Sequence, residues 1–156
     1  MRKDVLRRHS GQSMVEFAVL APVFFMLLLG TIDLGRAVYI YNSISDAARE
    51  GARAAIPFDS PLPTKAQVVG AVQSKLGGGF ALTVDPCIAN SSNPCPSTPT
   101  TPNTGTIWYS SGIGTPGRGS VTVKISFLFQ PWIPVIRDAS GNGVVISAQS
   151  TMVTEY

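Results

Sequence analysis

The strongest feature of the hydropathy pattern is one long apolar run near the N-terminus. Residues 17–32 carry no charge over sixteen positions, and counting back to Met14, with Glu16 inside, gives nineteen. A helix that crosses a bilayer needs about twenty such residues. A cleaved secretory signal has a shorter apolar core followed by a small-residue cleavage site, and no such site follows here. The pattern therefore predicts a single membrane span over about residues 14–32.

The helical pattern continues past the apolar run. Small and apolar residues recur at alternating steps of three and four: Ala37, Ile40, Ile44, Ala47, Gly51 and Ala54. This spacing places them on one face of a helix, and Pro57 ends the pattern. We therefore predict one helix from about residue 13 to residue 55, roughly 60 Å long, whose second half lies outside the membrane.

The rest of the chain predicts shorter elements. Thr64 is a suitable N-cap for a helix over residues 65–76, and three glycines at 77–79 stop it. Composition and alternation favour strands in four segments: 80–85, 106–110, 119–129 and 144–155. Residues 130–143 are interpreted as an apolar connection followed by a turn, so that the last two strands pair antiparallel. The expected fold class is α+β and pilin-like: a long N-terminal helix, a short helix and a small antiparallel β-sheet.

These elements divide the chain into three parts. Residues 1–11 form a basic leader, residues 12–56 form the long helix, and residues 57–156 form an exported α+β domain. Within this domain, residues 86–119 are rich in Pro, Ser, Thr, Asn and Gly. Such a composition is typical of a long irregular loop.

The positive charge of the chain gathers at its N-terminal tip. Four of the 12 Lys and Arg residues lie within the first eleven positions, and Asp4 is the one acidic residue there. From Gln12 onward, the remaining eight bases balance the remaining eight acids. A short basic tip before an apolar run is typical of a segment held on the cytoplasmic side of a membrane. A nucleic-acid partner would need a basic stripe on the folded domain, so we predict no nucleic-acid binding.

Both cysteines of the chain, Cys87 and Cys95, lie in the irregular loop. If everything after the span is exported, both reach an oxidising compartment, and we expect them to form a disulfide. Over so short a loop, a disulfide stabilises the fold by about 2.5 kcal/mol. A metal site needs three or four ligands, and the one histidine, His9, precedes the span. We therefore predict no metal site.

A carboxylate stands near the start of the apolar run. Glu16 is the fifth residue after Gly11, and the basic leader precedes that glycine. Charge is costly inside a bilayer, about 2.5–3.5 kcal/mol at the centre of a span. The order of leader, glycine, carboxylate and apolar helix resembles the signal of type IV pilins and pseudopilins. That resemblance implies that a membrane peptidase cuts between Gly11 and Gln12.

Such a cut would give Glu16 a specific role. The new N-terminus at Gln12 would carry a positive amine. When helices pack away from water, Glu16 needs a partner, and the amine of a neighbouring subunit can supply one. A pair formed only between subunits would set their axial register, as buried polar groups do in coiled coils. The alternative is a carboxylate at the headgroup level of an ordinary anchor.

The resemblance continues along the long helix, where the sequence resembles the TadE-like family. Members of this family are pseudopilins of the tight-adherence (Tad) pilus system. The resemblance covers about 45 residues. The matching features are Glu16–Phe17, Pro22, residues 33–36, Asn42 and residues 47–53. The resemblance implies a minor, single-pass subunit of the bacterial cytoplasmic membrane that supports assembly of an adhesive pilus. Its N-terminus would lie in the cytoplasm and its folded domain in the periplasm or outside the cell. The implied partners are the prepilin peptidase, other pilins or pseudopilins, pilus assembly membrane proteins and the lipid bilayer.

Two further groups on the long helix are candidates for specific roles. Small residues let another backbone approach closely, and four of them are helix-packing candidates: Ala47, Ala48, Gly51 and Ala52. The alternative is that this face packs on the chain's own sheet. Asp33 and Arg36 can pair one turn apart, but the interpretation that we favour is that they simply mark the boundary where the helix leaves the membrane.

Other functions stay open at this point. A membrane-anchored or pilus-tip adhesion module would use residues 86–119 as its contact surface. Trp108, Tyr109 and Trp132 would then be aromatic anchors, unless these rings fill a small core. A plain membrane anchor is a further possibility. An enzyme is disfavoured because the exported part has no histidine, scattered carboxylates and no phosphate-binding glycine loop. We predict no catalytic residue and no cofactor.

Overall fold

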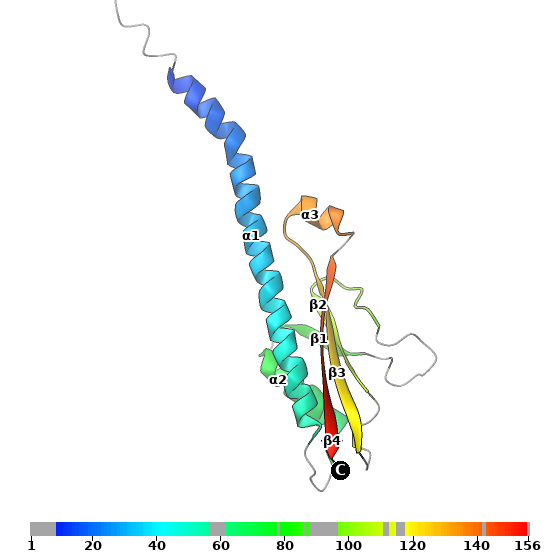
Figure 1. Ribbon diagram of the computed structural model, residues 1–156. Helices are drawn as coiled ribbons and strands as arrows, with labels where there is room; N and C mark the ends of the chain where they lie inside the picture. Colours follow the sequence, from blue (N-terminus) through cyan, green and yellow to red (C-terminus); the bar gives the residue numbers. More distant parts are fainter. Residues whose placement is uncertain are drawn as a thin grey trace, which may run out of the picture.

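The protein combines one long helix with a small sheet, which confirms the α+β fold class. The structure is a computed structural model and describes residues 9–56, 62–77, 79–85, 87, 97–110, 113–114, 118–141 and 143–155. The elements follow in the order α1 (His9–Ala54), α2 (Lys65–Leu76), β1 (Ala81–Val84), β2 (Thr104–Tyr109), β3 (Arg118–Phe129), α3 (Pro134–Ala139) and β4 (Val144–Glu155). In Figure 1, α2 and the sheet gather around the C-terminal half of α1, and its N-terminal half extends beyond them.

The two longer helices lie where the sequence predicts them. α1 is one helix of 46 residues that continues through Pro22 and begins one turn earlier than expected. α2 has the predicted bounds. Thr64 caps it by accepting a hydrogen bond from the backbone N–H of Gln67, whose side chain accepts one from the backbone of Thr64 in return. Gly77 ends α2 with a φ of 62°, a conformation that glycine adopts without strain.

The sheet is mixed, so the expectation of a purely antiparallel sheet was wrong. Its strand order is β1-β2-β3-β4, and β3 pairs antiparallel with both β2 and β4, as predicted for the last two strands. β1 instead pairs parallel with β2, with Ala81 opposite Thr104. A parallel neighbour requires a long crossover connection, and residues 85–103 carry the chain back to the end where β1 begins. Strand composition alone carries no information about this direction.

The core lies between one face of the sheet and the helices α1 and α2. Fully buried side chains come from all of these elements: Ile44, Val68, Val72, Ile107, Val123 and Ile125. The predicted face of the long helix is the one that meets this core. Ile40, Ile44, Ala47 and Gly51 are buried there, and the flanking Ala37 and Ala54 are half-buried.

The connection between β3 and β4 contains a helix that the sequence analysis did not predict. α3 begins with Pro134 directly after Ile133 and has six residues. In Figure 1 it lies beyond the end of the sheet, beside the N-terminal half of α1. The connection between β3 and β4 therefore reaches the part of α1 that the rest of the domain leaves uncovered.

Candidate functional site

The N-terminal half of α1 is apolar and uncovered. Its exposed large hydrophobic side chains are Met14, Val15, Phe17, Val19, Leu20, Val23, Phe24, Phe25, Met26, Leu27, Leu28, Leu29 and Ile32. Among the described residues, α1 is the one helix long and apolar enough to cross a membrane, and its most apolar stretch has no buried residue. An apolar surface of this extent indicates contact with lipid or with other helices.

The predicted processing residues and the carboxylate lie together at the start of this exposed half. Gly11, Gln12 and Glu16 all belong to α1. The side-chain amide of Gln12 donates a hydrogen bond to Oε1 of Glu16 at 3.3 Å. The two side chains therefore share one face of the helix. Residues 1–8 of the predicted leader lie outside the described residues. Cleavage after Gly11 and the pairing of Glu16 with another subunit stay predictions.

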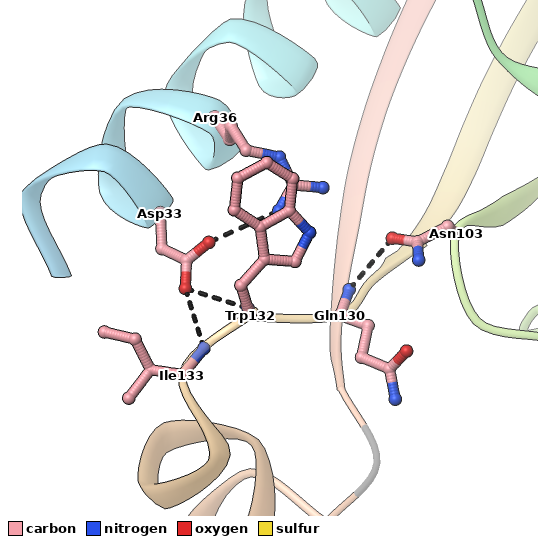
Figure 2. Close-up of polar contacts among 6 residues, drawn as sticks. All are labelled: Asp33, Arg36, Asn103, Gln130, Trp132 and Ile133. Carbon is pink, nitrogen blue, oxygen red and sulfur yellow. Dashed lines mark hydrogen bonds and ion pairs between the residues drawn. The ribbon is translucent and has the colours of Figure 1, made fainter. Parts of the chain in front are cut away.

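Asp33 joins α1 to the connection between β3 and β4. It is the first charged residue after the apolar run, and it is 5% exposed. Its Oδ2 accepts hydrogen bonds from the backbone N–H groups of Trp132 at 2.9 Å and Ile133 at 3.2 Å. Figure 2 shows the carboxylate pointing from α1 to the chain just before α3, with Oδ1 turned toward Arg36. Asp33 thus fastens two segments that are about a hundred residues apart in sequence.

Arg36 completes this junction. Its Nη1 lies 3.3 Å from Oδ1 of Asp33, so the one-turn pair that the sequence allowed is formed. The guanidinium carbon lies 4.2 Å from the ring centroid of Trp132 and 5.1 Å from that of Phe129. Cations over aromatic faces are attracted by the ring quadrupole. We call these four residues, with Ile133, the Asp33 junction.

A second polar contact holds the end of β3 beside the junction. The backbone N–H of Asn103 donates to the carbonyl of Leu128 at 2.8 Å. The side-chain oxygen of Asn103 accepts from the backbone N–H of Gln130 at 3.4 Å, as Figure 2 shows. Asn103 has a φ of 55°, a left-handed conformation that asparagine tolerates better than most residues. The chain that leads to Trp132 is therefore held from the β2 side as well.

An apolar hollow lies next to the Asp33 junction. Its volume is about 420 Å³. It is bounded by α1, the end of β3, α3 and the start of β4, through Gly30, Asp33, Leu34, Ala37, Phe129, Pro131, Ile136, Val144 and Ile146. The lining is almost entirely apolar, so the hollow suits a hydrocarbon group rather than a polar ligand.

The small residues of α1 pack inside the chain. Ala47, Ala48 and Ala52 are fully buried, and Gly51 is buried beside them. A Cβ on Gly51 would lie 2.5 Å from Cγ2 of Val72. The missing side chain thus lets α2 approach α1 closely. Of the two roles that the sequence left open for this face, packing against the chain's own domain is the one that the structure shows.

Asp85 holds the two ends of the cysteine loop. Its carboxylate accepts hydrogen bonds from the backbone N–H groups of Cys87 at 2.9 Å and Ser97 at 2.7 Å. Burial raises the pKa of Asp85, but the hydrogen bonds from Cys87 and Ser97 together outweigh this effect and hold the pKa below its usual value. Cys95 lies outside the described residues, so the Cys87–Cys95 disulfide stays a prediction.

The aromatic residues considered for adhesion are partly engaged within the chain. Tyr109 is buried and Trp108 is half-buried in β2. Trp132 is exposed, but one ring face meets Arg36. Much of the 86–119 loop lies outside the described residues, so adhesion through that loop stays open.

Another hollow, of about 490 Å³, has Arg36 in its wall. It is lined by Arg36, Tyr39, Ile40, Leu76, Gly77, Gly79, Phe80, Asn103 and Phe127. These residues include no carboxylate, histidine or cysteine. Within the part of the chain that the structure describes, no group of three or more His, Cys, Asp and Glu residues gathers as metal ligands would. A role without catalysis or a cofactor stays a prediction.

Comparison with known proteins gives one result for the N-terminal segment. The family model for TadE-like proteins matches residues 11–53. This confirms the resemblance noted in the sequence, over the helix that carries Glu16 and Asp33. Neither the curated proteins nor the solved structures gave a match. The TadE-like segment suggests a protein related to the Tad pilus, and the apolar α1 fits a single-pass membrane anchor.

Proposed function

We propose that this protein is a minor pseudopilin that supports biogenesis of a Tad adhesive pilus. The TadE-like match over residues 11–53 supports a place in that system. The observation that carries the proposal is the uncovered apolar half of α1, which begins beside Glu16 and continues to Ile32. Lipid and the helices of other pilins or pseudopilins would cover this surface. The protein would thereby act through packing in the membrane, not through a catalytic site.

The charge pattern gives the proposed orientation. The four bases of the leader keep the N-terminus in the cytoplasm. The folded domain then lies on the opposite side of the cytoplasmic membrane. Asp33, which is both the first charge after the apolar run and a contact of the folded domain, marks the boundary.

Glu16 would set the register between subunits. The hydrogen bond between the side chains of Gln12 and Glu16 places residues 12 and 16 on one helix face. After cleavage at Gly11, the amine of one subunit can approach Glu16 of the next subunit along such a face. An ion pair that forms only in this position favours one axial offset, because a shifted neighbour would leave the carboxylate unpaired.

The first test is the intact mass of the protein extracted from membranes, with and without the prepilin peptidase of the system. We expect loss of residues 1–11 only when the peptidase is present. An unprocessed chain in both samples would rule out the pairing of Glu16 with a new N-terminus.

The second test compares variants in a strain that lacks the native protein. Glu16→Ala and Glu16→Gln are expected to reduce surface pili and the recovery of other pilins with the protein, at unchanged membrane levels. Thr31→Ala is the matched control, since Thr31 lies on the same exposed half and its hydroxyl donates to the carbonyl of Leu27 one turn away. Normal pilus numbers in both Glu16 variants would contradict the register role, and normal numbers without the protein would contradict the proposed function.

A further inference from the structure

We propose that the segment from Trp132 to Arg137 is a second membrane contact, which rests in the lipid headgroup region beside the point where α1 leaves the bilayer. The occupant of this surface is the outer leaflet of the same bilayer that α1 crosses. This inference rests on the proposed membrane position of α1. We call the segment the interfacial foot.

The foot lies at the level of α1 where the uncharged run ends. Its first two backbone N–H groups bond to Asp33, the residue that directly follows the uncharged run. Cδ1 of Ile133 lies 3.8 Å from the position of a Cβ on Gly30, which is inside that run. Any bilayer that covers residues 14–32 therefore brings its surface to the level of the foot. Figure 1 shows α3 beyond the end of the sheet, beside the uncovered half of α1.

The outward-facing side chains of the foot suit a membrane interface. Trp132 is 64% exposed, Val135 62% and Ile136 43%, whereas Ile133 between them is buried. Tryptophan is enriched at membrane interfaces because it combines a large apolar ring with a polar N–H group. Amphipathic helices with basic residues on the polar face lie in the interfacial plane, and Arg137 supplies a basic residue here, with its Nε 3.7 Å from Oδ1 of Asp138. The aliphatic stem of Arg137 can extend along the lipid while the guanidinium reaches phosphate.

The apolar hollow lies between the foot and α1. Gly30 and Leu34 line it from α1, Ile136 from α3, and Val144 from the start of β4. The hollow of about 420 Å³ thus continues the lipid-facing surface of the span into the domain. We infer that it accommodates the upper part of a lipid acyl chain. A polar partner would find almost no hydrogen-bonding group on these walls.

The chain offers a built-in pair of probes for this proposal, because it has two tryptophans. The variant Trp108→Phe keeps Trp132 in the foot as its one tryptophan. The variant Trp132→Phe keeps Trp108, which lies opposite Lys124 in the register of β2 and β3. Each full-length variant is reconstituted in vesicles of phosphatidylcholine and phosphatidylglycerol, with or without lipids brominated near the headgroup. We expect several-fold stronger bromine quenching of Trp132 than of Trp108. Adding Val135→Asp and Ile136→Asp to the Trp132 probe should weaken that quenching.

A third variant separates this inference from the proposed function. It carries Phe24→Trp in the uncovered half of α1 as its one tryptophan, with both native tryptophans changed to Phe. If the Phe24→Trp probe is quenched by bromine deep in the acyl region but Trp132 is quenched no more than Trp108, the foot is refuted and the anchor stands. If neither position is quenched, the membrane position of α1 itself is wrong. A Trp132 that is shielded from aqueous acrylamide yet insensitive to brominated lipid would mean that protein covers it, which also overturns the proposal.

Discussion

Removal of the Asp33 carboxylate is the sharpest test of how α1 is joined to the rest of the fold. In Asp33→Ala, the N–H groups of Trp132 and Ile133 lose the acceptor that they share. An unsatisfied buried donor costs about 1–3 kcal/mol, and water recovers part of this cost at the more exposed Trp132. The ion pair with Arg36 adds at most about 1 kcal/mol, because the arginine side chain is 28% exposed.

Together these contributions predict that Asp33→Ala lowers the free energy of unfolding by about 2–4 kcal/mol. For a chain of this size, the midpoint of thermal unfolding should fall by about 5–15 °C. Asp33→Asn should lower the free energy of unfolding less, by about 1–2 kcal/mol, because its amide oxygen can still accept from the two N–H groups. The remaining loss arises because its NH₂ group and the Arg36 guanidinium are both donors.

The assay is thermal unfolding of the detergent-solubilised full chain, followed by circular dichroism. Hydrogen exchange supplies the local measurement, and the amides of Trp132 and Ile133 should exchange faster in Asp33→Ala. Asp46→Ala is the matched control, since Asp46 pairs with Arg49 at 3.7 Å on the exposed side of the same helix. The free energy of unfolding of this control should stay within about 0.5 kcal/mol of that of the native chain. If Asp33→Ala is as stable as Asp46→Ala, the carboxylate does not fasten the two segments and the reasoning fails.

Two further predictions concern the domain itself. Gly51→Ala should destabilise by about 1–2 kcal/mol, because the new Cβ would lie 2.5 Å from the stiff side chain of Val72 and the resulting overpacking outweighs the gain in helix propensity. Gly70→Ala, where a Cβ meets open space in α2, should stabilise by about 0.5–1 kcal/mol, and thermal unfolding in which both changes had the same sign would contradict the packing argument. Asp85 has a lowered pKa in the folded state, so its contribution to stability is present above the pKa of the unfolded chain, about 3.9, and is lost as the pH falls through the folded value. In urea titrations, Asp85→Asn should therefore be less stable than the native chain at neutral pH and should approach it in acid, whereas a constant difference at all pH values would refute the role of the charge.

The elements that the sequence predicted are those whose signals are local. Helix α2 is marked in the sequence by the N-cap Thr64 and the C-terminal Gly77. Strands β3 and β4 are marked by alternating apolar and polar residues. The parallel pairing of β1 was missed because its direction depends on where residues 85–103 carry the chain. α3 was missed although Pro134 stands at its first position, which is a recognised start signal of helices.

The candidate site divides in the same way. The one-turn spacing of Asp33 and Arg36 allowed their ion pair, although the favoured interpretation was a membrane boundary, and the length of the apolar run predicted a helix able to span a membrane. The partners of Asp33 could not be predicted, because backbone N–H groups carry no sequence mark and lie about a hundred residues away. For the small residues around Gly51, the sequence allowed either an outside helix or the chain's own sheet. Which of the two packs on this face depends on the valines of α2, and only the folded structure shows that they lie against Gly51.

The distance between Glu16 and Asp33, at the two ends of the apolar run, predicts how deep Glu16 lies in the bilayer. Glu16 and Asp33 are seventeen residues apart, which is roughly 26 Å along a helix. A helix tilted by about 20° projects this length to roughly 24 Å along the membrane normal, whereas the hydrocarbon core is about 30 Å thick. If the Asp33 junction and the interfacial foot rest at the outer surface, Glu16 lies roughly 6 Å inside the cytoplasmic surface. At that depth the carboxylate is past the headgroups but within reach of an amine created at Gln12 by cleavage on the cytoplasmic face. If the folded domain rests against the outer leaflet as proposed, the same geometry thus places Glu16 at a depth where an ion pair with the amine of another subunit would offset the cost of its charge.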